Sequence, residues 1–132
     1  MTCRCASIAM TEIIHTDGFD RDLKKLAKKY NSLFDDISVF EVALSTVRQI
    51  PLRDTPRISD LGAKYEKYPV YKVKAFRCRA LKGKGSKSGF RIIYYDDVKS
   101  DVIHLIQMYH KSTTEMHDSV RITEYLDQII SN

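Results

Sequence analysis

The chain has 132 residues, of which 43% are hydrophobic and 30% charged, and its formal net charge is +5. This length fits one domain with a core of its own, and the composition is ordinary for a globular protein. No apolar run approaches the roughly 20 residues that a transmembrane helix needs, and the start of the chain lacks the long apolar segment of a secretory signal. We therefore expect a cytoplasmic protein that does not bind membranes.

The three cysteines are an odd number, which argues against a disulfide framework and favours a reducing compartment. Cys3 and Cys5 form a CxC pair without a second ligand pair downstream, so a zinc site is not expected. Cys78 lies in a strand pattern and is expected to be a buried small hydrophobe. Residues 1–11 show no clear period, and we interpret them as a loosely ordered extension ahead of a single domain at 12–132.

The first part of the domain predicts one short strand and two helices. Glu12–His15 is a β-branched run, and Thr16, Asp17 and Gly18 after it offer helix N-cap chemistry. Two stretches of apolar residues at helical spacing follow, the second ending before Pro51, and they predict a helical hairpin whose apolar seam packs on a sheet. The two stripes are Phe19, Leu23, Leu26, Ala27 and Tyr30, and Leu33, Ile37, Phe40, Leu44 and Val47.

The middle of the chain predicts the main strands. Residues 51–70 contain all three prolines and predict an irregular connection, after which polar and apolar residues alternate from Tyr71. The phase slips at Phe76, which predicts a β-bulge. Phe90–Tyr95 and Val102–Tyr109 predict the next two strands. Because both alternate sets of the first of these are apolar, we expect the sheet to be covered on both faces.

The C-terminal part predicts the helix that covers the second face. Ser112-Thr-Thr-Glu115 matches the S-x-x-E capping box and predicts a helix that starts just after the last strand. The expected order is β-α-α-β-β-β-α, an α+β fold in which a small antiparallel sheet packs against an N-terminal helical hairpin. The apolar stripe of the C-terminal helix consists of Ile122, Tyr125, Leu126, Ile129 and Ile130.

Positive charge is concentrated between Glu66 and Asp96, where no acidic residue interrupts nine lysines and arginines. Such a one-sided field is what a polyanion-binding surface needs, and a solvated basic hairpin is the plain alternative. The loop at 82–89, KGKGSKSG, has backbone N–H groups and lysines that suit a phosphate backbone, but it lacks the GxxxxGK[ST] spacing of a P-loop. The nine residues are Lys67, Lys72, Lys74, Arg77, Arg79, Lys82, Lys84, Lys87 and Arg91.

Four segments, in their order and spacing, resemble the RelE/ParE superfamily of type II toxin–antitoxin toxins: FDRDLKKLAKKY, YKVK, SGFRIIYY and YHKS. The likeness covers roughly residues 12–125. RelE-type members are mRNA endoribonucleases that act in the ribosomal A site on the small subunit, with its 16S rRNA. ParE-type members poison DNA gyrase and mostly lack the basic catalytic cluster. Because this chain keeps that cluster, the resemblance implies a ribosome-dependent mRNA interferase with a cognate antitoxin as partner.

The resemblance places the catalytic positions of the family on five residues. The YKVK lysines are Lys72 and Lys74, and the arginine of the SG-aromatic-R segment is Arg91. The basic residue that ends the last strand is Lys111, where RelE itself has arginine. The aromatic or histidine position near the C-terminus is His117, where RelE has tyrosine, so the identity of the acid or base stays open.

Cleavage of RNA through its own 2′-hydroxyl needs a base, an acid and neutralising cations, and it needs no metal or cofactor. Lys72 and Lys74 share a strand face, and like charges favour the neutral amine, so either lysine is a candidate base. Arg91 stays charged and suits a phosphate, while His117 can give or take a proton. The plain alternatives are solvated side chains for Lys72, Lys74 and Lys111, an Arg91 paired with Asp96 or with the C-terminus, and an exposed His117. The scattered acidic residues and the absence of HExxH spacing predict no metal site.

Further RNA contacts are expected from the basic residues around the 82–89 loop and from the end of the last strand. Tyr109 can stack on an unpaired base, with core packing as the alternative. His110 is expected to pack or to orient other groups because it lies at the end of a strand. His104 is expected to be a satisfied core histidine. The other functions left open are a gyrase-type inhibitor and a non-catalytic RNA-binding module. The candidate RNA-binding residues are Arg77, Arg79, Lys82, Lys84, Lys87, Tyr109 and His110.

Overall fold

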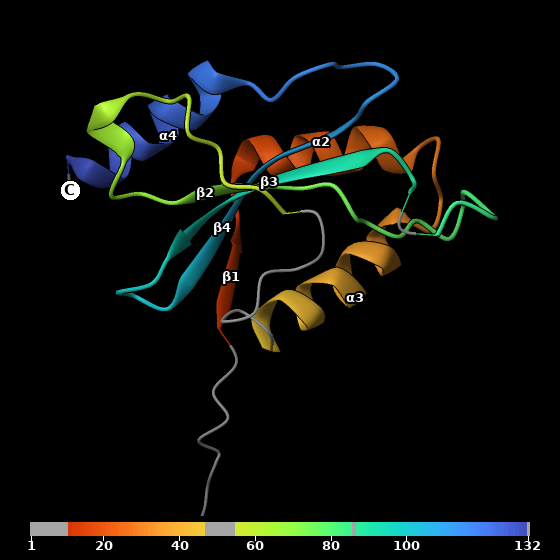
Figure 1. Ribbon diagram of the computed structural model, residues 1–132. Helices are drawn as coiled ribbons and strands as arrows, with labels where there is room; N and C mark the ends of the chain where they lie inside the picture. The colour runs from red at the N-terminus through yellow and green to blue at the C-terminus, as the bar shows by residue number, and fades with distance from the viewer. Residues whose placement is uncertain (1–10, 47–54, 86, 132) are drawn as a thin grey trace, which may run out of the picture.

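The computed structural model describes residues 11–46, 55–85 and 87–131 (Figure 1). It has an α+β fold with the predicted order of elements. Residues 1–10 of the expected extension, with Cys3 and Cys5, lie outside the described residues, as does Val47. The elements are β1 (Glu12–His15), α2 (Asp17–Ala27), α3 (Leu33–Thr46), a 3-10 helix (Ala63–Tyr65), β2 (Val70–Val73), β3 (Phe90–Asp97), β4 (Val102–His110) and α4 (Ser119–Ile130).

The four strands form one mixed sheet in the order β1-β4-β3-β2. The β2–β3 and β3–β4 pairs are antiparallel, as predicted, but β1 pairs parallel with β4, with Glu12 opposite Val102. The expectation of a purely antiparallel sheet is therefore wrong at this edge. β1 is held by the residue that follows it, because Thr16 donates from its backbone N–H and its hydroxyl to the carbonyl of Leu105.

The sheet is covered on both faces, as the two apolar sets of β3 predict (Figure 1). We call the side under the first two helices the α2/α3 face and the side under the last helix the α4 face. The core of the α2/α3 face includes Phe19, Leu33, Ile37, Phe40, Cys78, Ile92 and Leu105. The core of the α4 face includes Ile58, Val70, Ile93, Tyr95, Tyr109, Ile122 and Leu126. The buried position of Cys78 confirms its predicted role as a small hydrophobe.

The helix starts agree with the sequence at α2 and differ at α4. Thr16 caps α2 by accepting from the backbone N–H of Phe19, as predicted. The Ser112–Glu115 capping box is wrong, because α4 begins at Ser119 with Asp118 as N-cap. The hydroxyl of Ser112 instead lies 2.7 Å from Nδ1 of His110, and the backbone after His110 turns before any helix begins.

The predicted bulge also lies elsewhere. β2 ends at Val73, and Phe76 makes only an isolated bridge with Lys87. The chain leaves the sheet because the backbone N–H groups of Arg79 and Ala80 donate to side chains at the start of α3, and these long-range bonds are invisible in the local pattern. The register shift that the structure contains lies between Ile93 and Tyr94, opposite β4.

Candidate nucleic-acid cleavage site

Two of the predicted catalytic residues lie on the α4 face of neighbouring strands. Lys72 follows the fully buried Val70 by two positions in β2 and is paired with Ile93 of β3. Arg91 precedes Ile93 by two positions. Because residues two apart on a strand share a face, the sheet presents Lys72 and Arg91 on the same side.

A surface hollow of ≈ 290 Å³ brings three of the five predicted catalytic residues together. Lys72 lies in β2, Lys74 directly follows this strand, and His117 comes from the loop that precedes α4. The rest of the wall is the segment Pro56–Asp60, which runs beside β2. Two cationic side chains, an imidazole and a carboxylate therefore converge on one solvent-open site.

The surroundings of Lys72 in this hollow shift its pKa. Its pKa is lowered first by burial, and then by the positive charges of Lys74 and Arg91. The carboxylate of Asp60 opposes this change by favouring the charged amine. The direction agrees with the sequence argument from like charges, which missed burial as the first cause.

The side chain of His117 is nearly inaccessible to solvent, and the alternative of an exposed imidazole is wrong. Its side chain is 5% exposed, and it precedes the N-cap of α4 instead of lying in the first helical turn. Nε2 lies 3.4 Å from a carboxylate oxygen of Asp60, within ion-pair reach but without hydrogen-bond geometry. Neither ring nitrogen has a hydrogen-bond partner in the described part of the chain. Buried polar atoms are normally satisfied, so this ring retains hydrogen-bonding capacity for a ligand.

Arg91 borders the same group of charges. One guanidinium nitrogen donates to the carbonyl oxygens of Lys74 and Phe90, at 3.4 and 3.2 Å. The alternative of an ion pair with Asp96 is not observed, and Arg91 forms no ion pair within residues 11–46, 55–85 and 87–131. Its positive charge is thus not neutralised by a described carboxylate.

The fifth predicted catalytic residue, Lys111, does not line the hollow. It follows the last residue of β4, is exposed, and donates its backbone N–H to the carbonyl of Gly89. Tyr109 is 5% exposed and packs in the core of the α4 face, which is the alternative to base stacking. Burial raises the pKa of Tyr109, and the nearby charge of Arg91 opposes this shift.

The two histidines of β4 have structural contacts. His104 bonds through Nδ1 to the hydroxyl of Tyr125 at 2.6 Å, which confirms that it is satisfied, but it is half-buried instead of lying in the core. His110 lies on the α2/α3 face, where Nε2 is 2.9 Å from the carbonyl oxygen of Ser88 and the ring contacts Phe90. Its predicted orienting role fits this position better than a direct contact with RNA at the hollow.

The predicted RNA-binding loop is only partly free to bind. Arg77, Lys82, Lys84 and Lys87 are exposed around it. Arg79 is engaged with α3, because its side chain lies 3.0 Å from Asp36 and 3.3 Å from Asp35.

The carboxylate of Asp36 stays ionised within this contact. Burial raises its pKa, but hydrogen bonds from Ser32 and Arg79 outweigh that effect and leave the pKa lowered. Arg79 thus binds α3 through this contact, and its role in RNA binding stays a prediction.

Sequence reasoning missed Asp60. The residue stands in a proline-containing connection without periodicity, and only the fold brings it beside His117 and Lys72. An isolated acidic residue close to the basic stretch was the one available signal.

Two further properties concern the described residues as a whole. The described residues contain no group of three or more His, Cys, Asp and Glu side chains placed to hold a metal ion. None of their helices is both long and apolar enough to cross a bilayer.

Comparison with protein-family models, with curated proteins and with solved structures finds no match to this chain. Its function has to be inferred from the geometry of its own residues.

Proposed function

We propose that this protein is a type II toxin–antitoxin toxin of the RelE kind, an endoribonuclease that cuts translated mRNA without a metal or cofactor. The observation that carries the proposal is the convergence of Lys72, Lys74 and His117 on one hollow with Arg91 beside it. The order of elements, β-α-α-β-β-β-α, supports the same family, because the resemblance implies this order.

The chemistry follows from the state of each group. The neutral amine of Lys72 accepts the proton of the 2′-hydroxyl, and the 2′-oxygen attacks the adjacent phosphorus. The bond from phosphorus to the 5′-oxygen breaks, and protonated His117 donates a proton to that leaving oxygen. The products are a 2′,3′-cyclic phosphate and a free 5′-hydroxyl, so the phosphoryl group and both protons are accounted for.

Cations stabilise the charge that develops on the phosphorane oxygens. Arg91 can hold two of these oxygens with its planar fork, while Lys74 acts as a point charge at the mouth of the hollow. The exposed loop residues Lys82, Lys84 and Lys87 then bind the RNA backbone away from the reacting phosphate.

The ribosome supplies the positioning that this shallow site lacks. A hollow open to solvent holds a flexible RNA poorly, and correct placement of the reacting groups contributes a large part of catalysis in such reactions. The proposed substrate is therefore mRNA in the A site of the small subunit, and the proposed compartment is the cytoplasm. The proposed regulator is a cognate antitoxin that brings carboxylates to the basic surface, with salt-sensitive association.

The test is induction of the protein alone, followed by primer extension on cellular messages. Growth should stop, and new 5′ ends should appear within translated regions. A Lys72→Ala variant produced at the same level should neither stop growth nor create new 5′ ends. Equal cleavage of naked RNA would remove ribosome dependence but keep the nuclease. Growth arrest without new ends, accompanied by DNA cleavage by gyrase, would favour the ParE-type alternative.

A further inference from the structure

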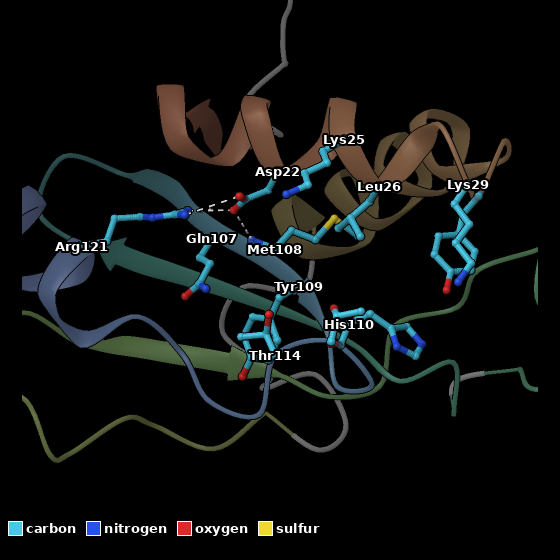
Figure 2. Close-up of a pocket in the computed structure, with 12 residues that line it drawn as sticks. Asp22, Lys25, Leu26, Lys29, Gln107, Met108, Tyr109, His110, Thr114 and Arg121 are labelled. Atoms are coloured by element: carbon cyan, nitrogen blue, oxygen red, sulfur yellow. Dashed lines mark hydrogen bonds and ion pairs between the residues drawn. The ribbon is translucent and has the colours of Figure 1, made fainter.

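A second cleft lies between α2, the end of β4 and the loop before α4 (Figure 2). Its volume is ≈ 460 Å³, and it shares no lining residue with the hollow at Lys72. Figure 2 shows one wall made by α2 and the floor made by β4, with Thr114 on the opposite side. Its charged lining residues are Asp22, Lys25, Lys29 and Arg121.

The floor of this cleft is the open edge of β4. β1 pairs with β4 only as far as Leu105, opposite His15, and the chain then turns into α2. Beyond Leu105, β4 continues to His110 with no described strand on this side. An edge without a neighbour exposes a row of backbone groups that can pair with another chain.

Most of these edge groups already have partners. The carbonyl of Ile106 accepts from Arg121, and the N–H of Met108 donates to Asp22, which is itself bound by Arg121 at 2.7 Å. The carbonyl of His110 accepts from the N–H groups of Thr113 and Thr114.

Two edge groups remain, the carbonyl of Met108 and the N–H of His110. Lys111 donates to the carbonyl of Gly89, so the alternation of an antiparallel pair directs the backbone of Tyr109 toward β3. The same alternation directs Met108 and His110 toward the cleft. Among the described residues, neither the carbonyl oxygen of Met108 nor the backbone N–H of His110 has a hydrogen-bond partner on this side.

These two groups fit a parallel strand. In a parallel pair, one residue donates its N–H to the residue before its opposite number and accepts from the residue after it. A segment with one residue opposite Tyr109 therefore satisfies Met108 and His110 together. It would continue the parallel direction that β1 already has along β4.

The charge of the cleft selects the chemistry of that segment. Lys25 is exposed in the last turn of α2, Lys29 is exposed in the turn that follows this helix, and neither forms an ion pair with a described residue. Asp22 is neutralised by Arg121. The cleft is thus positive on its α2 wall, and acidic side chains complement it.

We propose that this cleft docks an acidic, extended segment of a partner protein, which adds to β4 as a parallel strand opposite Tyr109. The backbone pairing supplies the orientation, and Lys25 and Lys29 supply the preference for acidic residues. This surface is independent of the proposed nuclease site.

The experiment is a selection from a displayed library of random nonapeptides on the full-length protein. Recovered sequences should be rich in Asp and Glu. Lys25→Glu with Lys29→Glu should weaken their binding about tenfold or more. The matched control is Lys24→Glu with Lys28→Glu, which makes the same charge change at exposed positions of α2 and its C-cap outside the cleft and should change binding less than about threefold.

Two further measurements test the pairing itself. N-methylation of the peptide residue opposite Tyr109 removes the donor to Met108 and should weaken binding about tenfold. A spin label at the peptide N-terminus should broaden the amide signal of Ile106, and one at the C-terminus that of Thr113. No enriched peptide, equal effects of the two double variants, tolerance of N-methylation at every position or the reverse label pattern would each overturn the proposal.

Discussion

Lys72 differs from the other cations of the basic stretch in its surroundings. It is half-buried beside two positive charges, while Lys74, Lys82, Lys84 and Lys87 are exposed. Burial and like charge act in the same direction on an amine, because both disfavour its protonated form. This residue is therefore the best-suited base of the proposed reaction.

Two single substitutions should shift the pH dependence of cleavage in opposite directions. With Lys72 as base, the rate rises as pH passes upward through its pKa. Lys74→Ala removes a charge that lowers this pKa, so the rise should move to higher pH. Asp60→Asn removes a charge that raises it, so the rise should move to lower pH. Single-turnover rates against pH measure both, and coincident profiles would exclude Lys72 as the base.

Asp60 should also fix the tautomer of His117. A carboxylate oxygen 3.4 Å from Nε2 favours the tautomer that carries its proton on that nitrogen. In Asp60→Ala we expect the imidazole ¹⁵N chemical shifts to move toward a mixture of tautomers. Measured on the free protein, the spectrum needs no substrate. An unchanged tautomer would assign Asp60 to charge balance at Lys72 alone.

Arg91→Ala should reduce cleavage by on the order of 10²–10³-fold, the scale for losing one preorganised electrostatic donor. The substitution also removes bonds to two backbone carbonyls, which should lower the free energy of unfolding by about 1 kcal/mol. Arg91→Lys should restore activity only in part, because an ammonium cannot hold two phosphate oxygens in a fork. Cleavage of a programmed ribosomal complex and a melting curve for each variant are the measurements. Full activity in Arg91→Ala would remove the residue from the site.

At the scale of elements, the start of α4 distinguishes the observed cap from the one predicted by the sequence motif. The side chain of Asp118 accepts from the backbone N–H of Arg121, so Asp118→Ala should lower the free energy of unfolding by about 1 kcal/mol. Glu115→Ala removes the acidic residue of the predicted capping box and should change it by less than about 0.5 kcal/mol. Urea unfolding compares the two, and a larger loss at Glu115 would contradict the observed helix start.

Periodicity predicted the helices and strands well because the spacing of apolar residues along a short segment indicates which of its faces is buried. The helical stripes through Phe19 and Leu33 are buried, and the two apolar faces of β3 are covered by different helices. The errors arise where distant contacts decide. The bonds from Arg79 and Ala80 to α3 end the strand early, and pairing with β4 sets the direction of β1.

At the scale of the whole molecule, the candidate site is assembled from three separate parts of the chain. Strand alternation was enough to place Lys72 and Lys74 together, and Arg91 follows from its position on the neighbouring strand. His117 entered only through the resemblance, and Asp60 was not found, because both lie in loops whose positions depend on tertiary packing. Lys111 fits the linear pattern but lies outside the hollow.

The two proposed functions are assigned to separate sites of the molecule. The hollow at Lys72 and the cleft at Lys25 share no residue, so one can be altered while the other is kept. Substitutions in the cleft therefore test binding of the partner, and substitutions in the hollow test RNA cleavage.

The most direct test of the central claim is single-turnover cleavage of mRNA in the A site of a programmed ribosomal complex, with the chemical ends of the products determined. The wild-type protein should cut the message and leave a 2′,3′-cyclic phosphate and a 5′-hydroxyl. Lys72→Ala, folded to the same melting temperature within a few degrees, should cut about 10²-fold or more slowly. No cleavage by the wild-type protein, or equal cleavage by Lys72→Ala, would contradict the claim.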